Sequence, residues 1–203
     1  EHCNLWRLTE DIHADWKRLI APFDDKLVKR LAQTRPGSYG DLDMLQIGPM
    51  GVPNRAEKIF RPSGLKPAEQ YLQLTLWSLL TQPLLLSCHV PTMDAFDLNL
   101  VTNAEVLAVN QDGLCEQGFR VKHKPGEFEV WAKVLEDGGK ALGLFNLSEH
   151  DAVLTFSAQE LGMVGALRDL WRQKDIGTLE HTFSVKVSSH GAVLLKIAPN
   201  VEL

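Results

Sequence analysis

Apolar and polar positions in the first part of the chain alternate between the periods of strands and helices. Residues 2–8 form a short apolar run with a polar end, which is typical of a buried strand. Apolar side chains then recur at helical spacing over 16–31, where Pro22 breaks the regularity. We therefore expect two helical pieces in this segment, with Asp11 or Asp15 as the N-cap.

This alternation continues further along the chain. Residues 41–48 have the pattern of a second strand, and a long loop rich in Pro and Gly follows over 49–66. We expect a helix over 67–82, then a continuously apolar strand over 84–86 and a helix over 94–108. The order strand, helix, strand, helix, strand, helix predicts a parallel α/β unit that is covered on both faces.

The pattern changes near position 113, after which short strands with alternating apolar positions dominate. Apolar and polar side chains alternate over 128–134 and 183–188, and an apolar run over 193–197 closes the series. Turns that contain Gly or Pro separate these strands. The second part of the chain is therefore expected to be an antiparallel β-sandwich, which gives two domains, 1–112 and 113–203.

Composition and charge limit the classes of protein to consider. The chain has 203 residues, of which 44% are hydrophobic and 23% charged, so disorder is excluded for the chain as a whole. Its 21 Lys and Arg residues are outnumbered by 26 Asp and Glu residues without a dense basic stripe, so we expect no nucleic-acid partner. No apolar stretch approaches the ~20 residues of a membrane span, so we expect no membrane partner either.

Charged residues near the ends of the first two predicted strands are candidates for chemistry. Asp41 and Asp43 are two positions apart, so on a strand both carboxylates would face one side, which is costly unless that side opens into a polar cavity. The alternative is that Asp41 caps or ion-pairs at a loop junction. Arg7 and Asp11 flank the end of the first strand, which is the usual place for active-site residues in a parallel barrel. A surface ion pair is the alternative for these two residues.

Cysteine and histidine give no sign of a metal centre. Three cysteines are too few and too scattered for a disulfide framework. Two groups contain both residue types: His2-Cys3 with His13, and Cys88-His89. Neither group has the ligand spacing of a zinc site, so we expect neither a metal nor a cofactor. Residues 146–148 match the N-glycosylation sequon, which is a weak signal at that length.

Several motifs lie in a fixed order along most of the chain. In sequence letters they are CNLWR followed by Asp11 (3–11), GDLDML (40–45), LWSLLTQPLL (76–85), NAEVLAVNQD (103–112), RDLW (168–171) and HGAVLL (190–195). Together they resemble glycoside hydrolase family 27, the α-galactosidase and α-N-acetylgalactosaminidase family. The resemblance implies an α/β plus all-β fold: the C-terminal part of a (β/α)8 TIM barrel over 1–112, then an antiparallel β-sandwich over 113–203.

The resemblance also implies an activity and its residues. The family hydrolyses terminal α-linked galactose-type sugars with retention of configuration, using two carboxylates. It implies that Asp11 is the acid/base and that Arg7 contacts the sugar near its 2-position. Asp43 and Met44 match residues that line the pocket. An acid that holds its proton near the working pH needs partial burial or a neighbouring carboxylate.

The chain departs from the family pattern in ways that bear on function. The family's nucleophile is an aspartate in a K-x-D motif on the fourth barrel strand, and this chain, which opens on Glu1 without an initiator Met, contains no such strand. We therefore expect it to carry the acid/base without the nucleophile, to be inactive alone, and to need the N-terminal barrel half or a partner chain besides its carbohydrate substrate. Tyr39-Gly40, Leu42 and His89 replace family residues, and the loop after strand five is absent, which leaves the exact sugar open.

Two other interpretations stay open. The chain could be a noncatalytic carbohydrate-binding or structural module derived from the same scaffold. It could also fold only with a partner chain that supplies the missing strands, since an open parallel edge is an aggregation liability. The resemblance favours a secreted, periplasmic or lysosome-like location.

Overall fold

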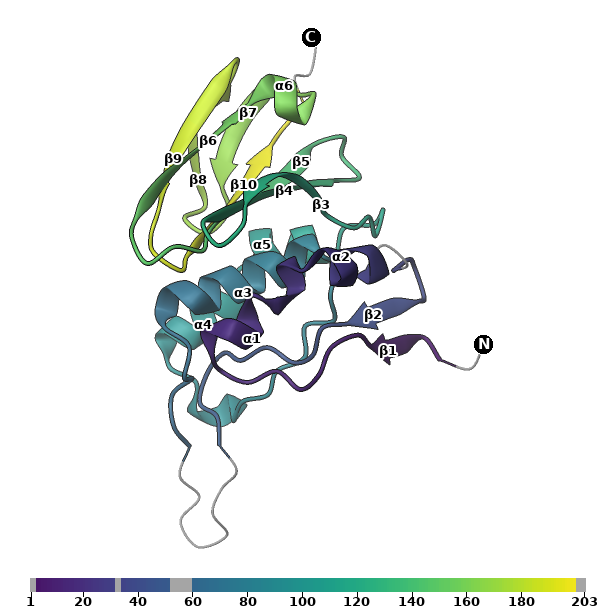
Figure 1. Cartoon of the computed structure of the whole chain (residues 1–203), viewed down its shortest axis with the longest axis vertical. Helices are drawn as coiled ribbons and strands as arrows, with labels where there is room; N and C mark the ends of the chain where they lie inside the picture. The colour runs from purple at the N-terminus through teal and green to yellow at the C-terminus, as the bar shows by residue number, and fades with distance from the viewer. Residues whose placement is uncertain (1–2, 32–33, 52–59, 200–203) are drawn as a thin grey trace, which may run out of the picture.

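The computed structural model describes residues 3–31, 34–51 and 60–199, and these residues form two stacked parts of different architecture. Figure 1 shows a helical part with a short parallel strand pair, and a β-sandwich that lies above it. The helix α3 (Pro67–Leu79) runs between the two parts, and most of its residues are buried. The predicted combination of an α/β part and an all-β part is confirmed.

The α/β part contains the parallel pair β1 (Leu5–Arg7) and β2 (Tyr39–Asp41). The chain approaches itself closely here, because a Cβ on Gly40 would lie only 2.4 Å from Leu8 Cδ1. Glycine is therefore required at position 40 unless Leu8 moves. Leu8 in turn belongs to the main hydrophobic core, which α3 dominates.

The other two strands predicted for this part, 41–48 and 84–86, do not form as such. β2 ends at Asp41 because Asp43 has a left-handed backbone conformation, with φ 85°. The 84–86 strand is reduced to a single parallel bridge between Leu86 and Leu45. The prediction that Asp41 and Asp43 share one face of a strand is therefore wrong. Asp41 instead caps the loop junction, where its Oδ1 accepts the N–H of Asp43 at 2.8 Å.

The helical segment over 16–31 is broken near Pro22, as predicted. Asp15 is the N-cap, and its Oδ1 accepts the N–H of Arg18 at 3.0 Å. The segment consists of α1 (Trp16–Leu19), the 3-10 helix η1 (Ala21–Phe23) and α2 (Asp25–Leu31). These short pieces bury their apolar side chains in the same core as α3.

The single helix predicted over 94–108 is divided in two by Asn103. Its Oδ1 accepts the N–H groups of Glu105 (3.0 Å) and Val106 (3.2 Å), so a new helix begins there. Its Nδ2 also donates to Leu170 O at 3.0 Å, in the sandwich. The elements of this region are the 3-10 helix η2 (Val90–Thr92), α4 (Ala95–Val101) and α5 (Ala104–Asn110).

The second part is an antiparallel β-sandwich, as predicted. A six-stranded sheet has the order β3-β4-β5-β10-β7-β8, and β6 pairs with β9 in a second sheet. The strands are β3 (Phe119–Lys124), β4 (Phe128–Val134), β5 (Lys140–Asn146), β6 (Ala152–Ser157), β7 (Gly165–Asp169), β8 (Lys174–Leu179), β9 (Thr182–Val187) and β10 (Ala192–Ile197). A one-turn helix, α6 (Ala158–Leu161), follows β6. Apolar side chains such as Leu142, Phe156 and Leu195 fill the space between the sheets.

The outer face of β4, which carries the polar residues of its alternating pattern, is buried against the helical part. Glu129, Trp131 and Lys133 are all buried there. Lys133 Nζ donates to Val109 O at 2.6 Å and to Thr81 Oγ1 at 2.9 Å, near the ends of α5 and α3. Burial lowers the pKa of Lys133 to about 8. Polar side chains therefore stabilise this interface in addition to the apolar ones.

Asn146, the asparagine of the sequon, is fully buried in the sandwich. Its Nδ2 donates to the carbonyl oxygens of His150 at 2.7 Å and of Val187 at 3.1 Å. The amide nitrogen that would carry a glycan is thus occupied inside the fold. The sequon match marks a structural asparagine in the folded chain.

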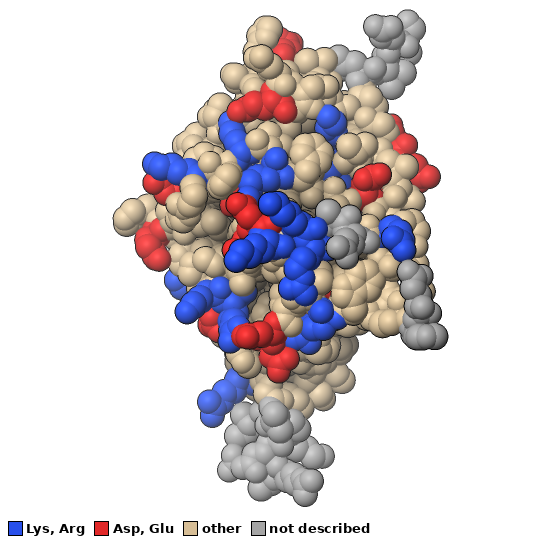
Figure 2. Space-filling model, turned by 45° about the vertical axis from the view of Figure 1, so that its right-hand side comes forward, with Lys and Arg blue, Asp and Glu red and all other residues tan. Residues whose placement is uncertain are grey.

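The surface carries charges of both signs side by side. Figure 2 shows Lys and Arg side chains gathered in the middle of one face, with Asp and Glu among them. Several opposite charges are paired, as Arg120 is with Asp25 and as Lys122 is with Glu160 at 2.7 Å. Among the described residues, no helix combines the length and the apolar character that crossing a bilayer requires.

Candidate active site

Arg7 ends β1 and lies between two carboxylates. Its Nη2 donates to Asp11 Oδ1 at 3.0 Å and also to Asp43 Oδ2. Asp11 follows β1 and Asp43 follows β2, so both lie beyond the carboxyl ends of two parallel strands. The structure therefore brings three of the predicted site residues together at the edge where barrel enzymes carry their chemistry.

Asp43 is firmly held at this edge. Its side chain is 12% exposed, and its two oxygens accept the N–H groups of Ile12 (2.7 Å) and Met44 (2.8 Å). Its carbonyl oxygen accepts the indole N–H of Trp77 at 3.0 Å. Aspartate is one of the residues that visit the left-handed region at modest cost, which fits the φ of 85°. The carboxylate that meets Arg7 is thus fixed by backbone contacts on both sides.

Asp11 differs from Asp43 in being open to solvent. Its side chain is 87% exposed, and among the described residues its carboxylate bonds only to Arg7. The described part of the chain therefore leaves the Asp11 carboxyl group unburied. A cleft of about 380 Å³ borders Asp11, with Leu8 and Ile12 among its apolar walls. Asp11 therefore combines an exposed carboxyl group with a position on the border of a cleft.

Met44 lies beside Asp43 at the same edge and is partly exposed. Its carbonyl oxygen accepts Gln73 Nε2 at 3.5 Å. Gln73 Oε1 in turn accepts the N–H of Gln46 at 2.8 Å, from a fully buried position in α3. The buried Gln73 side chain therefore fixes the backbone around Met44, while the Met44 side chain lies at the surface.

Two supporting residues of α3, Gln73 and Trp77, were not among the predicted site residues. Both are fully buried, and both hydrogen-bond to the backbone between Asp43 and Gln46. The sequence held a signal for them, because a buried Gln or Trp needs a hydrogen-bond partner and residues four apart share one helix face. They act on the site by fixing the backbone that carries Asp43.

The His and Cys groups do not form a metal centre in the part of the chain that the structure describes. No three His, Cys, Asp or Glu side chains converge there in an arrangement that could hold an ion. His89 stacks on Phe60 with the ring centroids 3.9 Å apart, and its Nδ1 lies 3.1 Å from Thr92 Oγ1. His2 lies outside the described residues.

Two family models match the chain. The model described as "Alpha galactosidase A" matches residues 1–112, and the model described as "Alpha galactosidase C-terminal beta sandwich domain" matches residues 125–197. Residues 113–124 fall between these matches, so the domain boundary at 112/113 stays a prediction.

Curated relatives cover almost the whole chain. Alpha-galactosidase 2 of Arabidopsis thaliana is 34% identical over 193 residues, which are 92% of this chain and 44% of the relative. The alpha-galactosidase of Oryza sativa subsp. japonica is 31% identical over 201 residues, 97% of this chain and 44% of the relative. The chain therefore spans less than half the length of these relatives.

Solved structures share the fold. A β-L-arabinopyranosidase of glycoside hydrolase family 27 from Geobacillus stearothermophilus is 29% identical, with a TM-score of 0.87 over 98% of this chain and 46% of that one. Alpha-galactosidase I from Mortierella vinacea, at 23% identity, shares the fold with a TM-score of 0.81 over 97% of this chain and 53% of that one. The α/β part is thus a portion of a (β/α)8 barrel. With one family model matching more than half of its residues, the chain belongs to glycoside hydrolase family 27, the α-galactosidase family, and includes that family's C-terminal β-sandwich.

Proposed function

We propose that this chain supplies the acid/base side of the active site of a retaining, α-galactosidase-type glycosidase. The observation that carries the proposal is the cluster of Arg7, Asp11 and Asp43 at the carboxyl ends of two parallel strands. Barrel enzymes place their catalytic groups at this edge. The membership of the family supports the assignment of glycoside hydrolysis to these groups.

Asp11 is the group that we assign to proton transfer. Its carboxyl group gives a proton to the glycosidic oxygen as the bond between that oxygen and the anomeric carbon breaks, while a second carboxylate attacks that carbon. The Asp11 carboxylate then takes a proton from a water molecule, whose oxygen displaces the second carboxylate and restores the original configuration. The exposure of Asp11 leaves its carboxyl group free to reach a leaving group.

Arg7, Asp43 and Met44 are assigned to sugar binding. Among the described contacts, Arg7 uses only Nη2 for the two aspartates, so its other N–H groups are free to donate to a sugar hydroxyl. Asp43 and Met44 border the same edge from the neighbouring loop. Fixed donors and acceptors of this kind orient a sugar ring against the acid/base.

The nucleophile and the rest of the pocket are proposed to come from outside these 203 residues. The sequence contains no K-x-D motif. One edge of β1 pairs with β2, and its other edge is where a further parallel strand would continue a barrel. We therefore expect the N-terminal half of the barrel, in the same polypeptide or in a partner chain, to pack against β1.

The sugar is proposed to be a terminal, α-linked residue of galactose type. Relatives with 31% and 34% identity are named α-galactosidases, whereas the family 27 structure with 29% identity is a β-L-arabinopyranosidase. These two sugars share a ring configuration and differ in the hydroxymethyl group at C5. Nitrophenyl α-galactoside and nitrophenyl β-L-arabinopyranoside are therefore the substrates to compare.

The test uses the gene product that contains this chain. Asp11→Asn is expected to lower kcat/KM by about 10²–10⁴-fold, which is the usual contribution of a general acid/base. Glu10→Gln is the matched control, because Glu10 is a neighbouring exposed carboxylate that pairs with Arg18. It is expected to change kcat/KM by less than about twofold. Unchanged activity of Asp11→Asn would contradict the proposal and favour a noncatalytic module.

A further inference from the structure

A second concave surface lies between α3 and the sandwich, and none of its lining residues belongs to the candidate active site. Its volume is about 520 Å³, within the range of about 300–1,000 Å³ that is typical of ligand pockets. Gly191 lies among its lining residues. A Cβ on Gly191 would lie only 2.4 Å from Ser188 Oγ, so glycine lets the Ser188 side chain approach the backbone closely there.

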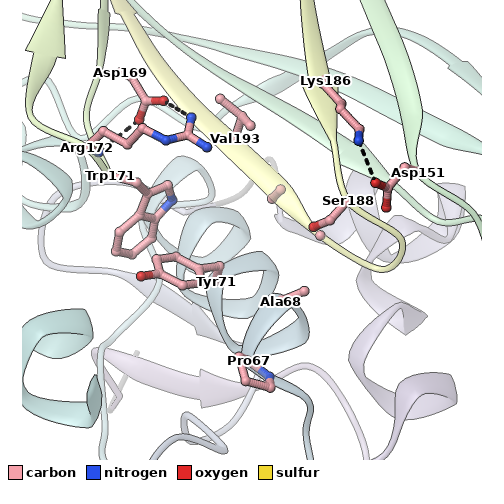
Figure 3. A pocket seen from close by; sticks show the side chains of 12 residues that line it. Pro67, Ala68, Tyr71, Asp151, Asp169, Trp171, Arg172, Lys186, Ser188 and Val193 are labelled. Carbon is pink, nitrogen blue, oxygen red and sulfur yellow. Dashed lines mark hydrogen bonds and ion pairs between the residues drawn. The ribbon is translucent and has the colours of Figure 1, made fainter. Parts of the chain in front are cut away.

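One end of this cleft is formed by two aromatic rings (Figure 3). Trp171, which follows β7, meets Tyr71 of α3 edge to face, with the ring centroids 4.7 Å apart and the planes at 89°. Trp171 Nε1 donates to Thr75 Oγ1 at 2.9 Å, which fixes the indole. Both rings are only partly buried. They therefore offer rigid aromatic surface to the cleft, of the kind that packs against the C–H groups of a sugar ring.

Two ion pairs line the cleft on its sandwich side (Figure 3). Arg172 Nη1 donates to Asp169 Oδ2 at 2.6 Å, and Lys186 Nζ donates to Asp151 Oδ2 at 2.9 Å. Asp169 is 2% exposed and Arg172 69% exposed, so the guanidinium is anchored on one side and open on the other. Each Lys or Arg that lines the cleft is thus matched by a carboxylate, and the cleft carries no net charge.

We propose that this cleft binds a neutral saccharide. A cleft without net charge does not attract an anion or a cation, whereas its carboxylates and guanidinium give sugar hydroxyls both acceptors and donors. Trp171 and Tyr71 stack on the sugar ring, and Arg172, Asp151 and the Ser188 hydroxyl bond its hydroxyl groups. This carbohydrate-binding function goes beyond the proposed hydrolysis, and each of the two can fail without the other.

The test is saturation-transfer NMR of D-galactose and of raffinose in the presence of the chain. Transfer to the sugar protons is expected, with a Kd of about 1 mM. Ala68→Trp fills the cleft from the first turn of α3, and Trp171→Ala removes the stacking ring. Each substitution is expected to weaken binding at least about tenfold. Val164→Trp, at an exposed position outside the cleft, is the control and is expected to bind like the unmodified chain.

Two further measurements separate this cleft from other sources of binding. Arg7→Ala is expected to leave galactose binding unchanged. Loss of galactose binding in this variant would overturn the proposal, because it would place the sugar at the candidate active site. Raising NaCl from about 0.05 to about 0.5 M is expected to leave Kd unchanged within about twofold, as for an uncharged ligand. A strong salt dependence would overturn the assignment of a neutral saccharide.

Absence of transfer with the unmodified chain would also overturn the proposal. So would binding by Ala68→Trp equal to that of Val164→Trp. A urea unfolding curve establishes whether each variant is folded. If Trp171→Ala is unfolded, the proposal is judged on the binding measured with Ala68→Trp. The activity of the gene product that contains this chain on nitrophenyl α-galactoside is expected to be the same with Ala68→Trp as without it.

Discussion

Arg7 is the residue on which the geometry of the candidate active site depends, because its Nη2 contacts both carboxylates. Lysine carries a compact charge and lacks the planar donors of a guanidinium. Arg7→Lys is therefore expected to lower kcat/KM at least about tenfold, equal to about 1.4 kcal/mol of transition-state stabilisation. Arg18→Lys is the matched control, since Arg18 forms an exposed pair with Glu10. Equal kinetics of the two variants on nitrophenyl α-galactoside would contradict this role of Arg7.

Lys133, buried at the interface between the two parts, is expected to make the stability of the chain depend on pH. Burial lowers its pKa from 10.5 to about 8, so between these pH values the unfolded chain binds a proton that the folded chain has released. The free energy of unfolding is therefore expected to rise from pH 8 to 10.5, relative to a Lys133→Met variant. Urea unfolding of both proteins across this range measures the difference. A difference that stays constant with pH would show that Lys133 does not titrate there.

The sequence indicated part of the site at the level of residues. Arg7 and Asp11 could be placed at a strand end because they follow the first apolar run. Their convergence with Asp43 depends on the parallel pairing of β1 with β2, which joins positions more than thirty residues apart. Only the motif resemblance indicated that Asp43 belongs with them. The support from Trp77 depends on packing that local pattern does not specify.

Among the elements, the division between α4 and α5 depends on Asn103. Asn103→Ala removes the cap of α5 and the hydrogen bond to Leu170 O in the sandwich. It is expected to lower the free energy of unfolding by about 1–2 kcal/mol. Asn99→Ala, at an exposed position within α4, is expected to change it by less than about 0.5 kcal/mol. Urea unfolding measures both, and equal effects would contradict the capping role.

Helices and sandwich strands were predictable because their apolar period is local. The strands predicted over 41–48 and 84–86 were not formed, since a short apolar run fits a buried irregular segment as well as a strand. The left-handed conformation of Asp43 ends β2, and it is held by contacts with Ile12 and Trp77 that are distant in sequence. Tertiary contacts therefore decided these elements.

At the scale of the whole molecule, a buried polar contact joins the two parts. His190, which precedes β10, stacks on Trp16 at 3.8 Å between ring centroids, and its Nδ1 lies 2.9 Å from Glu69 Oε1. His190→Ala leaves the buried Glu69 carboxyl without this partner. The free energy of unfolding is expected to fall by about 1–3 kcal/mol.

Because this contact spans both parts, they are expected to unfold together. Tryptophan fluorescence and far-UV circular dichroism of His190→Ala should give one coincident transition at a lower urea midpoint. His181→Ala, at an exposed turn between β8 and β9, is the control and should leave the midpoint unchanged. Two separate transitions in the unmodified chain would contradict the coupling.

The division of the chain into an α/β part and a sandwich could be predicted from its hydrophobic periods. The way in which the two parts pack could not. Alternation over 128–134 gives one face with Glu129 and Lys133, which is typical of a solvated face. That face is instead buried, because the ends of α3 and α5 supply hydrogen-bond partners for Lys133.

Azide rescue of a variant without the Asp11 carboxyl group distinguishes an acid/base from every other role of this residue. The measurement uses the gene product that contains this chain, with Asp11→Gly, on nitrophenyl α-galactoside. Without the Asp11 base, water attacks the glycosyl-enzyme only slowly, whereas azide attacks it without the help of a base. If Asp11 is the acid/base, azide is expected to restore turnover, and NMR is expected to identify the product as α-galactosyl azide. Unchanged activity without azide, no response to azide, or β-galactosyl azide as the product would contradict it.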